Sequence, residues 1–307
     1  MELKLRPIRR PLASRRRAPA VSGWLGRRRG RLRRLSGDLL LRLGEALYPR
    51  APGRWLRRRL ERGRVFSTVE LRLERCGPGL DGLKIAYLSD LHAGSFMLEA
   101  DLCRIFERVA RAEPDLVCLG GDLIEDRPEQ ILLLGKALSL LQPPLGIFAV
   151  PGNHEYDAEP GLMLWRSTLE EHGVEVLINR GQRVIRNGDS LWLAGVDDLS
   201  LGRPDLTQAL RGAGEDEPVL LLSHHPDFFY ESSHAGVDLT LSGHTHAGQI
   251  TLFGRVPLQH TLLGYWCGLF EEEGAQLYVG RGAGTTKLPL RVNAPAEVPL
   301  IRLLTRD

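Results

Sequence analysis

Histidine, aspartate and asparagine residues gather in five short motifs of this 307-residue chain. In chain order, the motifs are SDLH at 89–92, GGD at 120–122, GNHE at 152–155, SHHPD at 223–227 and GHTH at 243–246. Six of the nine histidines fall within these motifs, whereas ordinary surface or core histidines would be scattered along the chain. The motifs therefore predict one polar cluster.

The spacing within the motifs suits the binding of metal ions. Asp90 and His92 are two residues apart, so in an extended segment both side chains point the same way and can reach one ion. His244 and His246 repeat this geometry with two imidazoles. Asp122 follows two glycines that allow close approach, and one carboxylate can bridge two cations.

Two further motifs complete a set of seven candidate ligands. Asn153 offers a neutral carbonyl oxygen, which keeps the local negative charge down. The set consists of Asp90, His92, Asp122, Asn153, His224, His244 and His246. Imidazole, carboxylate and amide together suit Mn, Fe or Zn better than Ca or Mg alone. Seven ligands are too many for one tetrahedral zinc and fit a site for two metal ions.

Short apolar runs position the motifs. Strands are expected at 84–90, 115–122, 146–153, 191–197, 218–224, 238–242, 277–280 and 298–303, and helices at 98–112, 129–141 and 159–172. Strands that are apolar throughout are covered on both faces, as in layered α/β proteins. Since ligand sites in open α/β sheets gather outside the carboxyl ends of the strands, the motifs should converge there.

The ordered series of five motifs resembles the calcineurin-like metallophosphoesterase superfamily over residues 83–305. The segments 243–250 (GHTHAGQI) and 277–285 (LYVGRGAGT) are similar to its bacterial YkuE/YaeI-like branch. Five motifs in the right order are far more specific than any one alone. The resemblance implies a four-layer α/β/β/α sandwich that holds two divalent metal ions, with manganese first among the candidates, and hydrolyses phosphoric esters.

The resemblance also implies how the ligands divide. Asp90, His92, Asp122 and His246 would hold one ion, and Asp122, Asn153, His224 and His244 the other. Asp122 would therefore bridge the ions, and a hydroxide shared between them would attack phosphorus in line. Alternation along the chain puts His224 and His225 on opposite faces, and the family pattern favours His224 as the ligand.

His154 has a different implied role. Its neighbour Asn153 is a ligand, so His154 would lie at the rim and act as general acid or as a cationic contact to phosphate. Many relatives carry an aspartate three residues after the bridging aspartate, where it orients this histidine. The present chain has Glu125 at that position and Asp126 beside it, and either could take this part.

The formal net charge of +3 conceals a strong segregation of charge. Residues 1–65 carry 21 Lys and Arg against 4 Asp and Glu, a net of +17, whereas residues 66–307 carry 20 against 34, a net of −14. We therefore predict two units: a basic arm at 1–65 and a metallophosphoesterase domain at 66–307. A basic segment of this kind is typical of contact with a polyanion.

The arm has several possible roles. Its first 35 residues have too little apolar surface to order on their own. Leucines at 39–47 and apolar residues at 55–60 recur at helical spacing, as in basic helices that lie on anionic membranes. A helical hairpin packed on the acidic body and contact with RNA are the alternatives. Nucleic acid is the weaker expectation, because the aromatic interleaving of single-strand binders is lacking.

The sequence also disfavours several classes. It has no run of roughly 18–20 apolar residues, and no apolar core follows the arginines as in a secretory or twin-arginine signal. Its four cysteines form no CxxC pair, which suits a reducing compartment. We expect a cytoplasmic protein, peripheral on the inner membrane face, that cleaves phosphodiester or pyrophosphate bonds, including those of lipid-linked phosphates. Nucleotide or nucleic-acid phosphodiesterase activity is the alternative, and a non-catalytic scaffold fits least.

Overall fold

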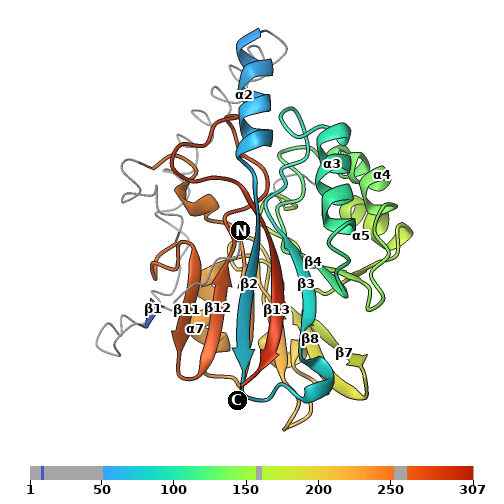
Figure 1. Ribbon diagram of the computed structural model, residues 1–307, viewed down its shortest axis with the longest axis vertical. Helices are drawn as coiled ribbons and strands as arrows, with labels where there is room; N and C mark the ends of the chain where they lie inside the picture. Colours follow the sequence, from blue (N-terminus) through green and yellow to red (C-terminus); the bar gives the residue numbers. More distant parts are fainter. Residues whose placement is uncertain (1–7, 10–50, 157–160, 252–260, 307) are drawn as a thin grey trace.

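Two β-sheets pack face to face in the computed structural model, which describes residues 8–9, 51–156, 161–251 and 261–306 (Figure 1). The six-stranded sheet has the order β2 (Val65–Leu73), β13 (Glu297–Thr305), β3 (Leu83–Leu88), β4 (Leu116–Leu119), β5 (Ile147–Ala149), β6 (Val174–Val176). The seven-stranded sheet has the order β1 (Ile8–Arg9), β11 (Gly268–Glu272), β12 (Ala275–Val279), β10 (Leu239–Ser242), β9 (Val219–Leu222), β8 (Asp189–Gly195), β7 (Arg180–Arg186).

Strand β3 shows why the central strands are apolar on both faces. Its residues Ile85 and Tyr87 belong to the core between the two sheets, which also contains Leu222 of the opposite sheet. Its residues Ala86 and Leu88 belong instead to the core beneath the helices. Because successive side chains of a strand point to opposite faces, both faces must be apolar to be buried.

Helices cover the outer faces of both sheets, which completes the predicted four-layer α/β/β/α sandwich. The six-stranded sheet is covered by α3 (Glu99–Ala110), α4 (Gly135–Leu138) and α5 (Gly161–Glu171) (Figure 1). The seven-stranded sheet packs against α6 (Leu206–Ala209), the 3₁₀ turn Pro226–Phe228 and α7 (Phe229–Ser232). Two more 3₁₀ turns lie at Pro78–Leu80 and His246–Gly248. The fold class expected from the sequence is thus confirmed.

The segment expected to be a helix at 129–141 has a different form. It folds as a 3₁₀ helix over Pro128–Leu134, followed by the single α-helical turn of α4. Ile131 and Leu134 are both fully buried and are three residues apart. A 3₁₀ helix has three residues per turn, so it aligns these two side chains on one side, towards the sheet.

Five strands lie outside the predicted apolar runs, namely β1, β2, β6, β7 and β11. Strands β2, β6 and β7 are at the edges of their sheets. In β2, buried residues alternate with more exposed ones, and β7 carries three arginines in seven residues. Edge strands are open to solvent, so their sequences lack the continuous apolar run that identifies a central strand.

Helix α2 (Ala51–Gly63) stands at the top of the molecule and leads directly into β2 (Figure 1). It contains the helix expected at 55–60 and contacts α3 through two ion pairs. Arg57 Nη2 lies 2.8 Å from Asp101 Oδ2, and Glu61 Oε1 lies 2.6 Å from Arg104 Nε. The arginine runs and leucines of 10–50 lie outside the described residues, and the boundary at residue 65 stays a prediction. Among the described helices, none combines the length and apolarity needed to cross a membrane.

The buried tryptophan of α5 gives a test of the helical layer. Trp165 is fully buried in the core of α3, α5 and the six-stranded sheet. We predict that Trp165→Ala lowers the free energy of unfolding by about 3–5 kcal/mol, because it leaves a large cavity. Met163→Ala in the same helix is the control: Met163 is 77% exposed, so its effect should stay within about 0.5 kcal/mol. If urea titrations show an equal loss in the free energy of unfolding for Trp165→Ala and Met163→Ala, this packing is contradicted.

Candidate metal centre

All seven predicted ligands lie just beyond the carboxyl ends of strands in the two sheets. Asp90 and His92 follow β3, Asp122 follows β4, Asn153 follows β5, His224 follows β9, and His244 and His246 follow β10. Contacts between the sheets show that the two sets meet. His246 Nε2 lies 3.4 Å from Asp90 Oδ1, and His224 Nε2 lies 3.1 Å from Asp122 Oδ2.

The ligand atoms form two neighbouring groups. Those of Asp90, His92 and His246 lie within 4.8 Å of one another, and so do those of Asp122, His224 and His244. Asp122 lies between the groups, because its Oδ2 atom is 3.1 Å from His224 Nε2 and 3.8 Å from His92 Nε2. One carboxylate is therefore placed where it could serve both groups.

The donor set fits divalent metal ions. His224 Nδ1 must donate to the carbonyl oxygen of Gly120, 2.7 Å away, so a neutral His224 directs an unprotonated Nε2 at the Asp122 carboxylate. The Nε2 atoms of His92 and His246 face each other at 3.0 Å. Among the described residues, the buried Asn153 Oδ1 has no hydrogen-bond partner. Such a convergence of acceptors calls for cations between them.

Five of the seven ligands have a left-handed backbone. The φ angles are 52° for Asp90, 48° for His92, 50° for Asp122, 68° for His244 and 51° for His246. This conformation costs a non-glycine residue on the order of 1–3 kcal/mol and is found mostly where function requires it. Non-glycine residues prefer negative φ angles, so contacts with the surrounding structure must hold these turns in place.

Close packing of two glycines explains how the ligand loops approach one another. A Cβ atom on Gly121, whose φ is 86°, would lie 2.7 Å from both Gly152 N and His224 Nδ1. A Cβ atom on Gly152 would lie 2.3 Å from Asp122 Oδ1. Only glycine lets the backbones of these loops come so near to the ligands.

The protonation of the site reflects its buried charges. Burial alone would raise the pKa of Asp122, but the nearby imidazoles, above all His224 and His154, hold it well below its usual range. Burial opposes charge on His224, yet Asp122 and Asp90 raise its pKa well above the ordinary value. The negative potential that favours a proton on His224 would equally favour a divalent cation.

Glu155 ties two ligand loops together. This fully buried carboxylate accepts hydrogen bonds from the backbone N–H groups of Asp122, Leu123 and Gly152, at 2.9, 2.7 and 2.6 Å. The glutamate of the GNHE motif thus fixes the GGD motif of the neighbouring strand. Its role is to set the spacing between the loops that carry Asp122 and Asn153.

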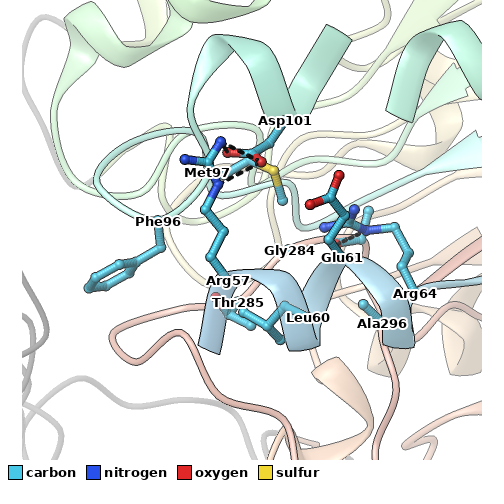
Figure 2. Close-up of a pocket in the computed structure, with 11 residues that line it drawn as sticks. Arg57, Leu60, Glu61, Arg64, Phe96, Met97, Asp101, Gly284, Thr285 and Ala296 are labelled. Carbon is cyan, nitrogen blue, oxygen red and sulfur yellow. Dashed lines mark hydrogen bonds and ion pairs between the residues drawn. The ribbon is translucent and has the colours of Figure 1, made fainter. Parts of the chain in front are cut away.

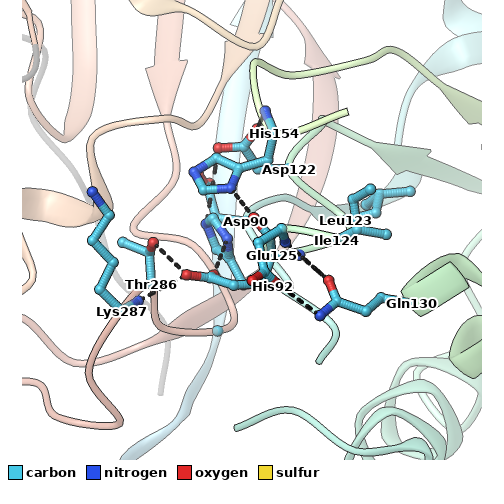
Figure 3. Close-up of polar contacts among 12 residues, drawn as sticks. Asp90, His92, Asp122, Leu123, Ile124, Glu125, Gln130, His154, Thr286 and Lys287 are labelled. Atoms are coloured by element: carbon cyan, nitrogen blue, oxygen red, sulfur yellow. Dashed lines mark hydrogen bonds and ion pairs between the residues drawn. The ribbon is translucent and has the colours of Figure 1, made fainter. Parts of the chain in front are cut away.

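Glu125 links His92 to a distant loop. Its Oε2 atom lies 2.7 Å from His92 Nδ1, and its Oε1 accepts hydrogen bonds from Thr286 Oγ1 at 3.0 Å and Lys287 N at 2.9 Å (Figure 3). Nearby histidine charges outweigh the effect of burial and lower the pKa of Glu125. A carboxylate at Nδ1 leaves Nε2 of His92 available towards Asp90 and His246, as expected of a metal ligand.

His154 lies above this cluster, beside Asp122 (Figure 3). Its backbone N–H donates to Asp122 Oδ1 at 2.9 Å, and its Nδ1 donates to the backbone carbonyl of Glu125. Asp126 faces another way, because its Oδ1 accepts a hydrogen bond from Gln130 Nε2 at 2.8 Å. Of the two acidic residues considered for His154, Glu125 therefore makes this contact, and it does so through its main chain.

A sixth polar strand end lies outside the five predicted motifs. Asp197 and Asp198 follow β8, the neighbour of β9, and Asp198 is fully buried. Asp198 is one of the negative charges that raise the pKa of His224. Asp197 accepts a hydrogen bond from Tyr156 of the GNHE loop. The rule that located the other motifs, polar residues directly after an apolar strand, applies equally to these two.

Comparison with known proteins agrees with this geometry. The chain is 33% identical over 251 residues to a transmembrane protein with metallophosphoesterase domain from Danio rerio, covering 76% of this chain and 56% of that protein. It is 38% identical over 236 residues to a metallophosphoesterase from Helicobacter pylori, covering 73% of this chain and 60% of that protein. It is 32% identical over 230 residues to the metallophosphoesterase YkuE from Bacillus subtilis, covering 73% of this chain and 80% of that protein.

The chain spans less than two thirds of the length of the first two of these relatives. The family model described as calcineurin-like phosphoesterase matches residues 83–248, which is more than half of the chain and includes all seven predicted ligands. By its matching family model and its relatives, this chain belongs to the calcineurin-like phosphoesterase family.

Proposed function

We propose that the protein is a phosphoesterase that uses two metal ions to hydrolyse phosphodiester or pyrophosphate bonds. The observation that carries the proposal is the meeting of six nitrogen and oxygen ligands at the ends of four strands, with Asp122 between the two groups. The buried, unpartnered Asn153 Oδ1 lies beyond the end of a fifth strand. When bound there, two divalent ions, with manganese the first choice, would supply an activated water and neutralise charge on the phosphoryl oxygens.

The surrounding residues would position the reaction. Glu155 and Glu125 keep the loops of Asp122 and His92 in register. His154 is half-buried at the rim and is held by Asp122 and by the main chain of Glu125. Because its Nδ1 is occupied by the carbonyl, Nε2 is the atom from which His154 would give a proton to the leaving oxygen.

The role of His154 can be tested with two leaving groups. We predict that His154→Gln lowers turnover of an alkyl phosphodiester by about 10²–10⁴-fold, the usual contribution of a general acid. Turnover of bis-p-nitrophenyl phosphate should fall much less, because p-nitrophenolate leaves without protonation. Both assays use manganese. Asp216→Asn is the control, because Asp216 is an exposed carboxylate near Arg75. Its turnover of both substrates should equal that of the wild type.

Two outcomes would count against the proposal. Equal losses on both substrates would contradict proton donation by His154 and favour a contact to phosphate. If the wild-type protein with manganese hydrolyses no member of a panel of phosphodiesters and pyrophosphates, the phosphoesterase proposal itself fails.

We further propose that the protein is peripheral on the inner face of the membrane and that its substrate is a lipid-linked phosphate. Helix α2 supports this, because its two faces differ. Leu60, together with Arg64 directly after the helix, faces the body and lines a narrow pocket with Met97 (Figure 2). The opposite face exposes four residues at helical spacing, Trp55, Arg58, Arg59 and Arg62.

This outer stripe of α2, Trp55 with Arg58, Arg59 and Arg62, has the chemistry of a surface for anionic lipid. Trp55 is 59% exposed, and Arg59 lies over its ring at 5.6 Å. No ion pair joins the three arginines to any of the described residues. Exposed tryptophan and unpaired arginine are the residues that settle at an anionic membrane interface.

Arg64, the residue that follows α2, connects the helix to the candidate metal centre. Arg64 Nε donates to the carbonyl oxygen of Ala283 at 2.9 Å, and Ala283 N in turn donates to Ser89 O at 2.9 Å. Ser89 directly precedes the ligand Asp90. A membrane that binds the stripe would therefore lie close to the loop that carries the first ligands, which suits a lipid-linked substrate.

The outer stripe can be tested without deleting the arm, since deletion of 1–65 would also remove Arg64. We predict that Arg58→Gln, Arg59→Gln and Arg62→Gln together weaken binding to vesicles of phosphatidylcholine and phosphatidylglycerol about 100-fold, at about 1 kcal/mol per arginine. Turnover of a soluble diester should be unchanged. Co-sedimentation measures the binding.

A matched triple variant controls for net charge. Arg111, Arg166 and Arg211 are exposed arginines of the body, and their replacement by glutamine removes the same charge. This variant should bind vesicles as the wild type does. Equal weakening in the two triple variants, or none in the stripe variant, would contradict docking through α2.

A further inference from the structure

Arg291 is a cation placed directly behind a predicted metal ligand. Its Nη2 lies 3.1 Å from Nδ1 of His246, and its Nη1 donates to the backbone carbonyl of the same residue at 3.1 Å. Burial lowers the pKa of Arg291 to about 9, so the side chain is still charged at neutral pH. A positive charge here opposes metal binding at His246, and its presence needs another explanation.

The other hydrogen bonds of Arg291 supply one. Nε donates to the carbonyl of Gly284 at 2.9 Å, and Nη2 donates to the carbonyls of Gly282 and Gly284 at 3.1 and 2.7 Å. Nη1 also donates to the carbonyl of Ala294 at 3.2 Å. One planar guanidinium thus joins three segments of the chain, which the single ammonium of a lysine could not do.

The loop that Arg291 holds presses against Asp90. Gly284 N donates to the carbonyl of Asp90 at 2.8 Å. Gly282 has a φ of 73°, and a Cβ atom there would lie 2.7 Å from Asp90 Cβ. Arg291 therefore touches His246 directly and Asp90 through this loop. These are two members of the same ligand group, the one completed by His92.

The turn at His246 has particular need of support. His246, Ala247 and Gln249 have φ angles of 51°, 50° and 48°, so three of four consecutive residues are non-glycines in the left-handed region. Each costs on the order of 1–3 kcal/mol unless the surroundings hold it. The bond from Arg291 to the His246 carbonyl lies at the start of this turn.

We propose that Arg291 is a positioning residue for the metal ion held by Asp90, His92 and His246. It fixes the strained His246 turn and the 282–284 loop relative to each other, and so sets the distance between His246 and Asp90. This inference rests on the proposed two-metal function. It concerns the geometry of one ligand group.

The sign of the effect on metal affinity separates positioning from charge. If Arg291 acted only by its charge, Arg291→Gln would tighten manganese binding, because a repelling cation is removed. Positioning predicts weaker binding, by about 10–100-fold for one of the two ions, as is usual when a residue behind a ligand is lost. Arg291→Lys keeps the positive charge but loses the planar guanidinium with its several donors, so its affinity for manganese should fall by a similar factor. Calorimetric titration with manganese measures both affinities.

Arg75 offers a matched control at a distance. Its guanidinium also binds several acceptors, the Asp238 carboxylate and the carbonyls of Glu215 and Gly236, none of which belongs to the candidate metal centre. Arg75→Gln should lower the melting temperature measured in EDTA at least as much as Arg291→Gln does. It should leave both manganese affinities as in the wild type.

Several results would overturn the inference. Unchanged or tighter manganese binding by Arg291→Gln would exclude positioning. A fall in the affinity for both manganese ions in Arg75→Gln, as large as that in Arg291→Gln, would exclude it as well. If the wild-type chain binds no manganese at all, the two-metal function fails first. The titration needs no substrate, so failure of the phosphoesterase proposal and failure of the Arg291 inference can be told apart.

Discussion

Acceptor atoms that face one another in a buried space are the constraint around which this protein is organised. His224 Nε2 points at the carboxylate of Asp122, and the Nε2 atoms of His92 and His246 point at each other. Protons or metal ions must lie between such atoms, since lone pairs repel at these distances. Divalent ions would satisfy all of them together, and would allow five buried ligands, two half-buried ones and their supporting glutamates to lie at one edge of the sandwich.

The two-sheet architecture makes that convergence possible. Parallel strands β3, β4 and β5 of one sheet and β8, β9 and β10 of the other bring their carboxyl ends to the same place. The loops beyond them are strained or tightly packed and are held by buried ionic groups: Glu155 between two loops, and Glu125 behind His92. Stability of the sandwich thus supports a site whose local conformations are unfavourable.

The sequence predicts the central strands and the ligand motifs because both depend on short-range patterns. An apolar run followed by Asp, Asn or His is visible without knowledge of the fold. Edge strands such as β7 lack that pattern. Asp198 fits the pattern but is not among the predicted site residues. The parts played by Glu125 and Arg291 could not be predicted, since each depends on contacts with segments far away in the chain, at Lys287 and His246. The roles of residues 10–50 stay predictions.

Asp122, between the two ligand groups, is placed to serve two metal ions at once. Equilibrium dialysis against manganese, followed by elemental analysis, measures the ions bound per chain. We predict two for the wild-type protein, two for His154→Gln, and loss of both for Asp122→Asn, because neither group keeps its shared carboxylate. A single ion in the wild type, or two ions retained by Asp122→Asn at wild-type affinity, would contradict a bridged pair.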